Sequence, residues 1–202
     1  MPPARLLGDE FAPMSFAPAP EVLEWLTESI LTDTGPIHNP DHLHLLSADL
    51  RVLWASGPSR SKGRAVIGTA EEVAFRCSLW QKARQELQMR EWFGHVPDWL
   101  ITLDASYCAQ CDDAAFCALV EHELYHIAQE NDEFGAPAFT KEGLPKIKLV
   151  GHDVEEFVGV VRRYGVGSEG GNLAKLVRAA KSAPEVAPIN LVHACGACLK
   201  VA

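Results

Sequence analysis

The pattern His-Glu-Leu-Tyr-His at residues 122–126 constrains the fold of this chain more than any other feature of the sequence. Histidines four residues apart can reach one point if the backbone between them is helical, because such positions lie about 40° apart around a helix axis. Apolar residues fall on the opposite side of this helix: Phe116, Val120, Leu124 and Ile127. We therefore expect a long helix from Asp112 to about Glu130, with one buried face and a histidine face turned toward a cleft.

The same pattern has a chemical meaning. Two imidazole nitrogens on one helical face can bind one zinc ion, and Glu123 lies beside them, where it can take a proton from water. The alternative interpretation is an amphipathic helix with two surface histidines and solvating acids. A catalytic zinc site usually has three protein ligands, and we expect the third within residues 151–157. His152 is the first choice, and Glu155 or Glu156 is the alternative, which would give a two-histidine, one-glutamate site.

Length and composition are those of an ordinary folded protein of about one domain. The chain has 202 residues and is 48% hydrophobic. Its net charge of −9 opposes attraction to phosphate backbones. We therefore do not expect this chain alone to bind nucleic acid, and we interpret the basic loop 60–64 as a solvated turn.

No run of residues approaches the ~18 apolar residues of a membrane span, and the N-terminus lacks the apolar core of a secretory signal. A cytoplasmic location and no membrane partner are expected.

Apolar spacing and turn residues predict the remaining elements. Residues 1–19 are rich in Pro and Ala and are interpreted as a flexible leader, 20–182 as the folded domain, and 183–202 as a tail. Helices are predicted at 20–31, 79–93, 153–164 and 173–181. Strands are predicted at 99–103 and within 42–56, with a loop or irregular hairpin at 131–150. Strands and helices mixed without regular alternation indicate the α+β class.

The strand at 99–103, the helix with HELYH and the later HDVEEF at 152–157 resemble the family of putative phage metallopeptidases, relatives of the SprT-like zincin domains. The resemblance extends over residues 20–165, and HELYH and HDVEEF are its specific part. It implies a zincin-like fold, with a small twisted sheet packed beside a long HExxH helix and further helices. In SprT-like proteins a later histidine in an H-G-x-x-F setting is the third ligand, which corresponds here to His152. Asp153 replaces the glycine, and Phe157 stands one residue later.

The resemblance also implies a function, that of a zinc metallopeptidase. Glu123 would be the general base for a metal-activated water, and the substrate would be a peptide or protein. Zincins can pair a strand with an extended peptide, and the strand before the ligand helix is our candidate: Leu100, Ile101, Thr102 and Leu103. Tyr125 and Tyr164 are candidates for stabilising an oxyanion. The alternative is a non-catalytic zinc-binding regulatory or DNA-associated SprT-like protein; the intact Glu123 favours the enzyme, because a structural site needs no general base.

Four of the six cysteines form two C-x-x-C pairs, Cys108/Cys111 and Cys195/Cys198. Two such pairs can build a closed four-thiolate structural zinc site, which would add a second ion to the catalytic one. Unconnected thiols and redox pairing are the alternatives. His42 and His44 alternate along a predicted strand, and we interpret them as packing or exposed residues rather than as a second metal site.

Overall fold

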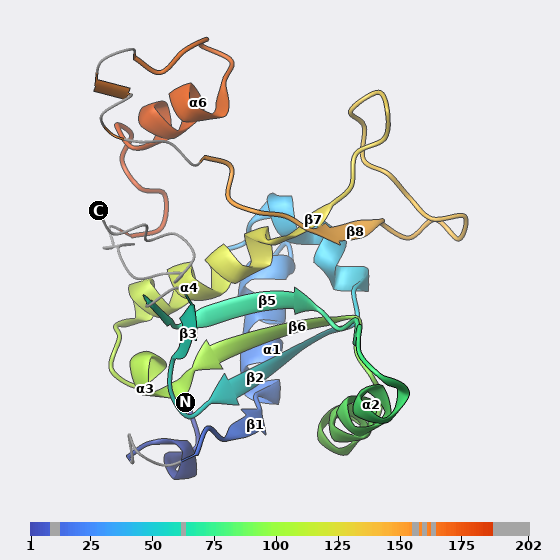
Figure 1. Cartoon of the computed structure of the whole chain (residues 1–202). Coiled ribbons are helices and arrows are strands. Elements are labelled where there is room, and N and C mark those ends of the chain that lie inside the picture. Colours follow the sequence, from blue (N-terminus) through green and yellow to red (C-terminus); the bar gives the residue numbers. More distant parts are fainter. Residues whose placement is uncertain (9–12, 62–63, 155–157, 159–160, 163–164, 188–202) are drawn as a thin grey trace. The chain divides into compact units, whose positions relative to one another are not determined.

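A computed structural model describes residues 1–8, 13–61, 64–154, 158, 161–162 and 165–187 (Figure 1). The architecture is mixed α/β, with small sheets and several helices. The described residues form two compact units, one within 1–150 and one within 151–187. The second unit contains α6 (Asn172–Ala179), close to the helix predicted at 173–181. Among the described residues, no helix combines the length and the apolar character needed to cross a membrane.

A four-stranded sheet lies at the centre of the first unit, in the order β1 (Phe16–Pro18), β2 (Leu50–Ala55), β6 (Trp99–Asp104) and β5 (Gly68–Glu72). The two inner strands are parallel, and both outer strands are antiparallel to their neighbours. The inner sequences LRVLWA and WLITLD are almost entirely buried. Near-continuous runs of branched and aromatic residues are typical of strands that are covered on both faces.

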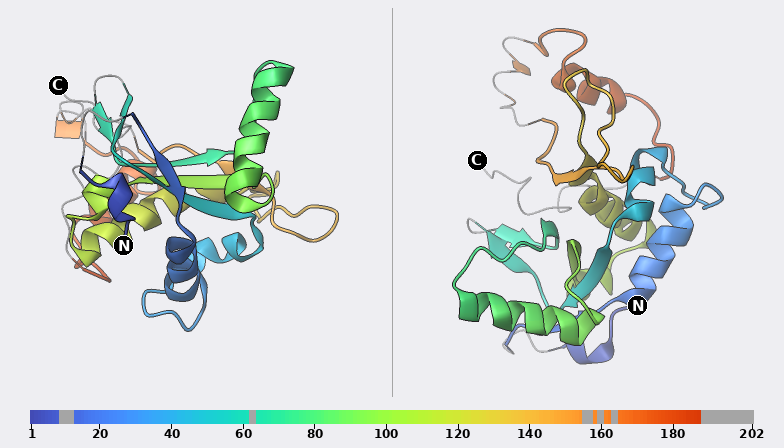
Figure 2. Two further views of the ribbon diagram at one scale, coloured as in Figure 1. Left: turned by 90° about the horizontal axis from the view of Figure 1, so that it is seen from below. Right: turned by 90° about the vertical axis from the view of Figure 1, so that its right-hand side faces the viewer.

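Helices cover both faces of this sheet (Figure 2). On one face, α1 (Pro20–Leu26) and α4 (Asp113–Tyr125) enclose the main core, in which Trp54 and Leu103 are buried. On the other face, Met89 of α2 (Leu79–Phe93) packs against Leu53 and Leu100. Full burial of a large apolar side chain contributes roughly 1.5–3 kcal/mol, so the main core holds α4 firmly on the sheet.

Local signals explain the ends of the first two helices. Pro20 is the first residue of α1, which continues as η2 (Thr27–Leu31), so the helix predicted at 20–31 is confirmed. Ser78 and Gln81 form a capping box at the start of α2. Gly94, with a φ of +80°, ends α2 in the left-handed conformation that glycine adopts most easily. The helix predicted at 79–93 is therefore confirmed at both ends.

Two expectations about the N-terminal half are wrong. Residues 40–47 form a 3-10 helix, η3 (Pro40–Ser47), where a strand was expected to start, and the strand of this region begins at Leu50. Asn39 caps η3 by accepting the amide of Asp41, and Pro40 follows the cap. The expected leader also contributes to the fold. Residues 16–18 are the edge strand β1, in which Ala17 is buried, and η1 (Ala4–Leu6) buries Leu6.

The helix α4, which carries His122, is shorter than expected. α4 ends at Tyr125, and the next residues form β7 (Ile127–Gln129), which pairs with β8 (Ile147–Leu149). The hairpin expected within 131–150 is confirmed, with its pairing extended by bridges such as Asn131 to Pro137. A separate hairpin joins β3 (Ser59–Ser61) to β4 (Arg64–Val66). The helix predicted at 153–164 falls largely outside the described residues.

Candidate metal centre

The helix α4 begins and packs as its sequence requires. The carboxylate of Asp112 accepts the amide of Ala115 at 2.8 Å and so caps the first turn. Leu119, Val120 and Leu124 are buried against the sheet and α1. The packing of these residues fixes the rotation of the helix about its axis, and therefore fixes the direction in which the remaining residues of α4 point.

His122 and His126 lie one turn apart at the C-terminal end of α4. Both are half-buried, and their ring centroids are 5.0 Å apart with an angle of 77° between the planes. The Nδ1–H of His126 donates to the carbonyl of Val150 at 2.7 Å, because a carbonyl oxygen can only accept. This bond places the proton on Nδ1 and leaves the lone pair on Nε2, which is the arrangement that a histidine ligand needs.

The backbone brings a third histidine to the same end of the helix. The amide of Val150 donates to the carbonyl of His126 at 2.8 Å, and His152 follows Val150 by two residues, a span of at most about 7 Å. One ring nitrogen from each of His122, His126 and His152 lies within 4.8 Å of the others. In a tetrahedral zinc site with Zn–N distances of ~2.0–2.1 Å, ligand nitrogens lie about 3.3 Å apart. The three imidazoles therefore fit a metal ion after small side-chain movements.

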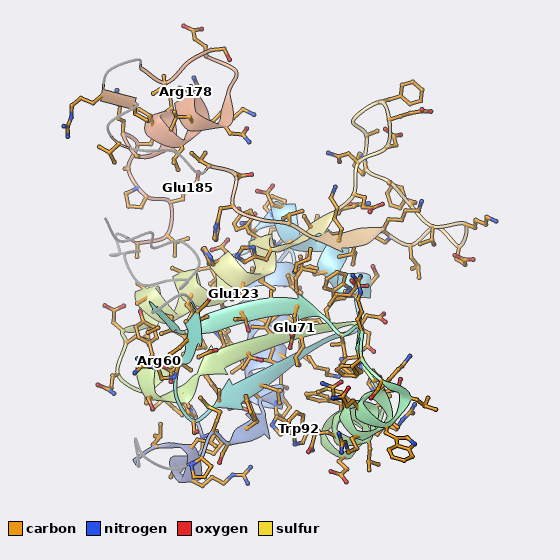
Figure 3. The ribbon with its side chains drawn as sticks, in the orientation of Figure 1. Arg60, Glu71, Trp92, Glu123, Arg178 and Glu185 are labelled. Atoms are coloured by element: carbon orange, nitrogen blue, oxygen red, sulfur yellow. The ribbon has the colours of Figure 1, made fainter. Side chains whose placement is uncertain are left out.

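Glu123 lies between the two helical histidines in sequence and is fully buried. Figure 3 shows it on α4 beside β5. A Cβ atom built on Gly68 of β5 would lie 2.5 Å from Oε1 of Glu123 and 2.9 Å from Cδ1 of Leu119. The glycine therefore gives the carboxylate its place under β5. Nothing in the sequence pattern around Gly68 singled it out, since the contact joins residues 55 positions apart.

The short helix η3 contacts the C-terminal half of α4 through polar side chains. Asn39 Nδ2 donates to Oε1 of Glu121 at 2.5 Å, and the hydroxyl of Tyr125 donates to Asp41 at 3.1 Å. His44 Nε2 donates to the carbonyl of Ile127 at 2.7 Å. These bonds fix the position of the last turn of α4, which His126 follows directly. They also engage the hydroxyl of Tyr125, which the sequence offered as an oxyanion donor.

His42 is a buried histidine of η3. Its ring makes an edge contact with Tyr125, with centroids 4.4 Å apart, and its Nε2 lies 3.8 Å from Glu121. That nitrogen has no hydrogen-bond partner among the described residues. Burial, and next the nearby His44, lower the pKa of His42 to about 4. His42 is therefore a neutral packing residue at pH 7, as expected, but it lies on a helix rather than on a strand.

The expected substrate strand is wrong. Leu100, Ile101, Thr102 and Leu103 lie in β6, which pairs with β2 on one side and with β5 on the other. Both edges of β6 are occupied by backbone hydrogen bonds, so no peptide can add to it. β5 is the outer strand at this end of the sheet.

The remaining candidates lie apart from these histidines or outside the described residues. Five candidates lie outside the described residues: Glu155, Glu156, Tyr164, Cys195 and Cys198. The alternative third ligands and the four-thiolate site therefore stay predictions. Cys108 is the last residue of α3 (Ala105–Cys108) and Cys111 follows three residues later, where its thiol donates to the carbonyl of Cys108 at 3.6 Å. Burial is the largest cause that raises the pKa of both thiols, so they are protonated at neutral pH unless a metal binds them.

Comparison with known proteins bears on the same region. A family model described as "Putative phage metallopeptidase" matches residues 23–181. The match covers well over half of the chain. It includes α4, β5 and β6, and it includes His122, His126 and His152. Neither the comparison with curated proteins nor the comparison with solved structures gave a match.

Proposed function

The chain belongs to the family of putative phage metallopeptidases, and we propose that it is a zinc-dependent peptidase of zincin-like fold that hydrolyses peptide bonds with Glu123 as general base. One observation carries the proposal. Three imidazole nitrogens lie within 4.8 Å of one another, and the fully buried carboxylate of Glu123 is on the residue next to one of them. A structural metal site has no need of such a neighbour.

His122, His126 and His152 would hold the ion. Three neutral imidazoles suit zinc, and a set of three protein ligands leaves one position open, as in catalytic rather than structural sites. When bound, zinc supplies a water of lowered pKa and polarises the scissile carbonyl. The hydrogen bond from His126 Nδ1 to Val150 holds that ring in the required tautomer.

Glu123 would move the protons of the reaction. Its carboxylate accepts a proton from the attacking water and then donates it to the leaving amine. The packing of α4 against β5 keeps this side chain away from bulk water, and charge interactions are stronger in such surroundings than in water. The close approach of Gly68 leaves the carboxylate little freedom to move, so it would be held in the geometry that proton transfer requires.

The peptide substrate would lie along β5 rather than β6. The pairing of β5 with β6 uses one edge of the strand, and β5 is the last strand of the sheet at this end. An extended peptide can add to such an edge through main-chain hydrogen bonds. Because Gly68 lies against Glu123, a peptide bound along β5 would pass close to the general base.

Replacement of Glu123 by Gln tests this function. The variant should keep one zinc per chain, since Glu123 is not a proposed ligand, and hydrolysis of a fluorogenic peptide library should fall by at least ~10²-fold. Glu130→Gln is the matched control, because it removes the same charge from a position beyond the end of α4, and it should retain activity. Equal turnover by Glu123→Gln and wild-type protein would refute the assignment. Zinc binding without turnover in the wild type would support a regulatory, non-catalytic protein instead.

A further inference from the structure

The helix α2 carries two separate apolar faces. Successive residues of a helix are rotated by about 100°. Met89, Trp92 and Phe93 therefore share one arc, and they belong to the small core between α2 and the sheet. Leu79, Trp80, Ala83 and Leu87 share a second arc, whose centre is about 140° from that of the first. The second arc thus points away from the surface on which α2 rests.

This second arc, which we call the outer stripe, is strongly exposed. Trp80 is 82% exposed, Leu79 78% and Leu87 57%. Residues 79–85 are all exposed, because the first half of α2 extends away from the sheet (Figure 2). A tryptophan can remove 150–250 Å² from water when it is buried. Several large apolar side chains along one exposed helical face are typical of an interaction surface rather than of scattered surface residues.

We propose that the outer stripe binds the outer stripe of a second copy of this chain, with the two α2 helices antiparallel. The stripe is suited to pairing with itself. Ala83 lies near its middle, with Trp80 three residues before it and Leu87 four residues after it. A two-fold rotation about a point close to Ala83 places Trp80 of each copy beside Leu87 of the other. The small side chain at the centre lets the two helix axes approach to about 8 Å.

The charges beside the stripe are complementary under the same rotation. Lys82 and Glu86 lie on one flank and form an ion pair of 3.6 Å within the helix. In an antiparallel pair about a two-fold axis, the same flanks of both helices face each other, and the rotation places Lys82 of each copy opposite Glu86 of the other. A contact with an unrelated partner would not require this symmetry.

The size of the contact sets the expected affinity. α2 has 15 residues and is therefore about 22 Å long. One helix pair of this length buries less than the ~800 Å² per partner of a standard interface. The dimer should accordingly be weak, with a dissociation constant on the order of 10⁻⁵ M.

Sedimentation velocity of the full-length protein tests the proposal. Between ~5 and ~200 μM, the wild type should shift from monomer to dimer. Reducing agent is needed throughout, because Cys77 is exposed just before α2. The variant with Trp80→Gln and Leu87→Gln should stay monomeric and keep its circular dichroism spectrum, since both side chains are mostly exposed. Phe134→Gln removes an equally exposed aromatic side chain from the β7–β8 hairpin, and this control should dimerise like the wild type.

A charge exchange tests the antiparallel arrangement. Lys82→Glu alone should weaken the dimer about tenfold, and Lys82→Glu combined with Glu86→Lys should restore it, because acid and base again face each other. A wild type that is monomeric at ~200 μM would overturn the proposal, and so would a dimer that is unaffected by the Trp80 and Leu87 changes. Loss of the dimer without restoration by the charge exchange would overturn the antiparallel arrangement.

Discussion

Replacement of Gly68 by Ala should disable the proposed general base, Glu123, without loss of the proposed zinc ion. The added Cβ would lie 2.5 Å from Oε1 of Glu123, about 0.9 Å closer than the 3.4 Å at which ordinary contact begins, and 2.9 Å from Leu119. Either the carboxylate or the strand must move by a similar distance. Overpacking of this kind costs about 1–3 kcal/mol of stability, or roughly 2–12 °C in Tm for a chain of this size. Misplacement of a catalytic group by ~1 Å can lower kcat by about 10²-fold.

The assay combines zinc content, Tm and peptidase kinetics on the purified protein. Zinc should stay at one ion per chain in Gly68→Ala, because the added methyl group meets Glu123 and Leu119 rather than the histidine rings, while kcat falls. Gly57→Ala is the matched control. A Cβ at Gly57 would meet no atom within 4 Å, so stability and turnover should not change. Wild-type kcat in Gly68→Ala would refute this prediction, because it would show that contact with β5 does not position the carboxylate.

Three further predictions concern pH, the cysteines and nucleic acid. The pKa of His42 is lowered to about 4 from 6.5, mainly by burial, so the native state binds fewer protons than the unfolded state between these values. Stability should therefore fall by about 2 kcal/mol from pH 7 to pH 5, and thermal unfolding of His42→Leu should show a smaller acid effect. If the C-x-x-C pairs at 108–111 and 195–198 share a structural zinc, truncation before His193 should lower Tm and release about one zinc per chain; unchanged zinc content would exclude that site. In a DNA titration at ~150 mM salt, we expect a Kd weaker than ~10⁻⁵ M, and submicromolar, salt-sensitive binding would contradict this.

Strong local signals in the sequence correctly predicted several elements. Ser78 and Gly94 bracket α2, and both ends of that helix follow from the capping box and the C-terminal glycine. The helical spacing of His122 and His126 placed both rings on one face of α4, as their ring contact shows. In each case neighbours within a few residues determine the conformation, so a single sequence contains the information that is needed.

Errors arose where distant segments decide the outcome. The helix α4 was expected to continue to Glu130, but residues 127–129 form a strand that pairs with β8. Val150 forms hydrogen bonds with both the backbone and the ring of His126. β6 was expected to offer an edge to the substrate, yet β5 takes that edge. Strand order depends on the whole sheet, and no periodicity within residues 99–103 could show which strand is outermost.

Gly68 illustrates the same limit at the site itself. In sequence it is one glycine among 15, and its role follows from its distance to Glu123 in space. The contacts of Asn39 and Asp41 with α4 also join segments more than 80 residues apart. The residues that carry the proposed chemistry could be found from their spacing, whereas the residues that position them required the fold.

Zinc content and X-ray absorption of the purified protein test the central claim most directly. With Cys108, Cys111, Cys195 and Cys198 replaced by Ser, so that neither C-x-x-C pair can hold zinc, we predict one zinc per chain with three imidazole nitrogens at ~2.0–2.1 Å and one oxygen from water. His126→Ala and His152→Ala should each lose the ion or bind it far more weakly, because each variant keeps only two of the three proposed imidazole ligands. A protein with these cysteine replacements that binds no zinc would contradict the account, and full zinc occupancy in both histidine variants would contradict it as well.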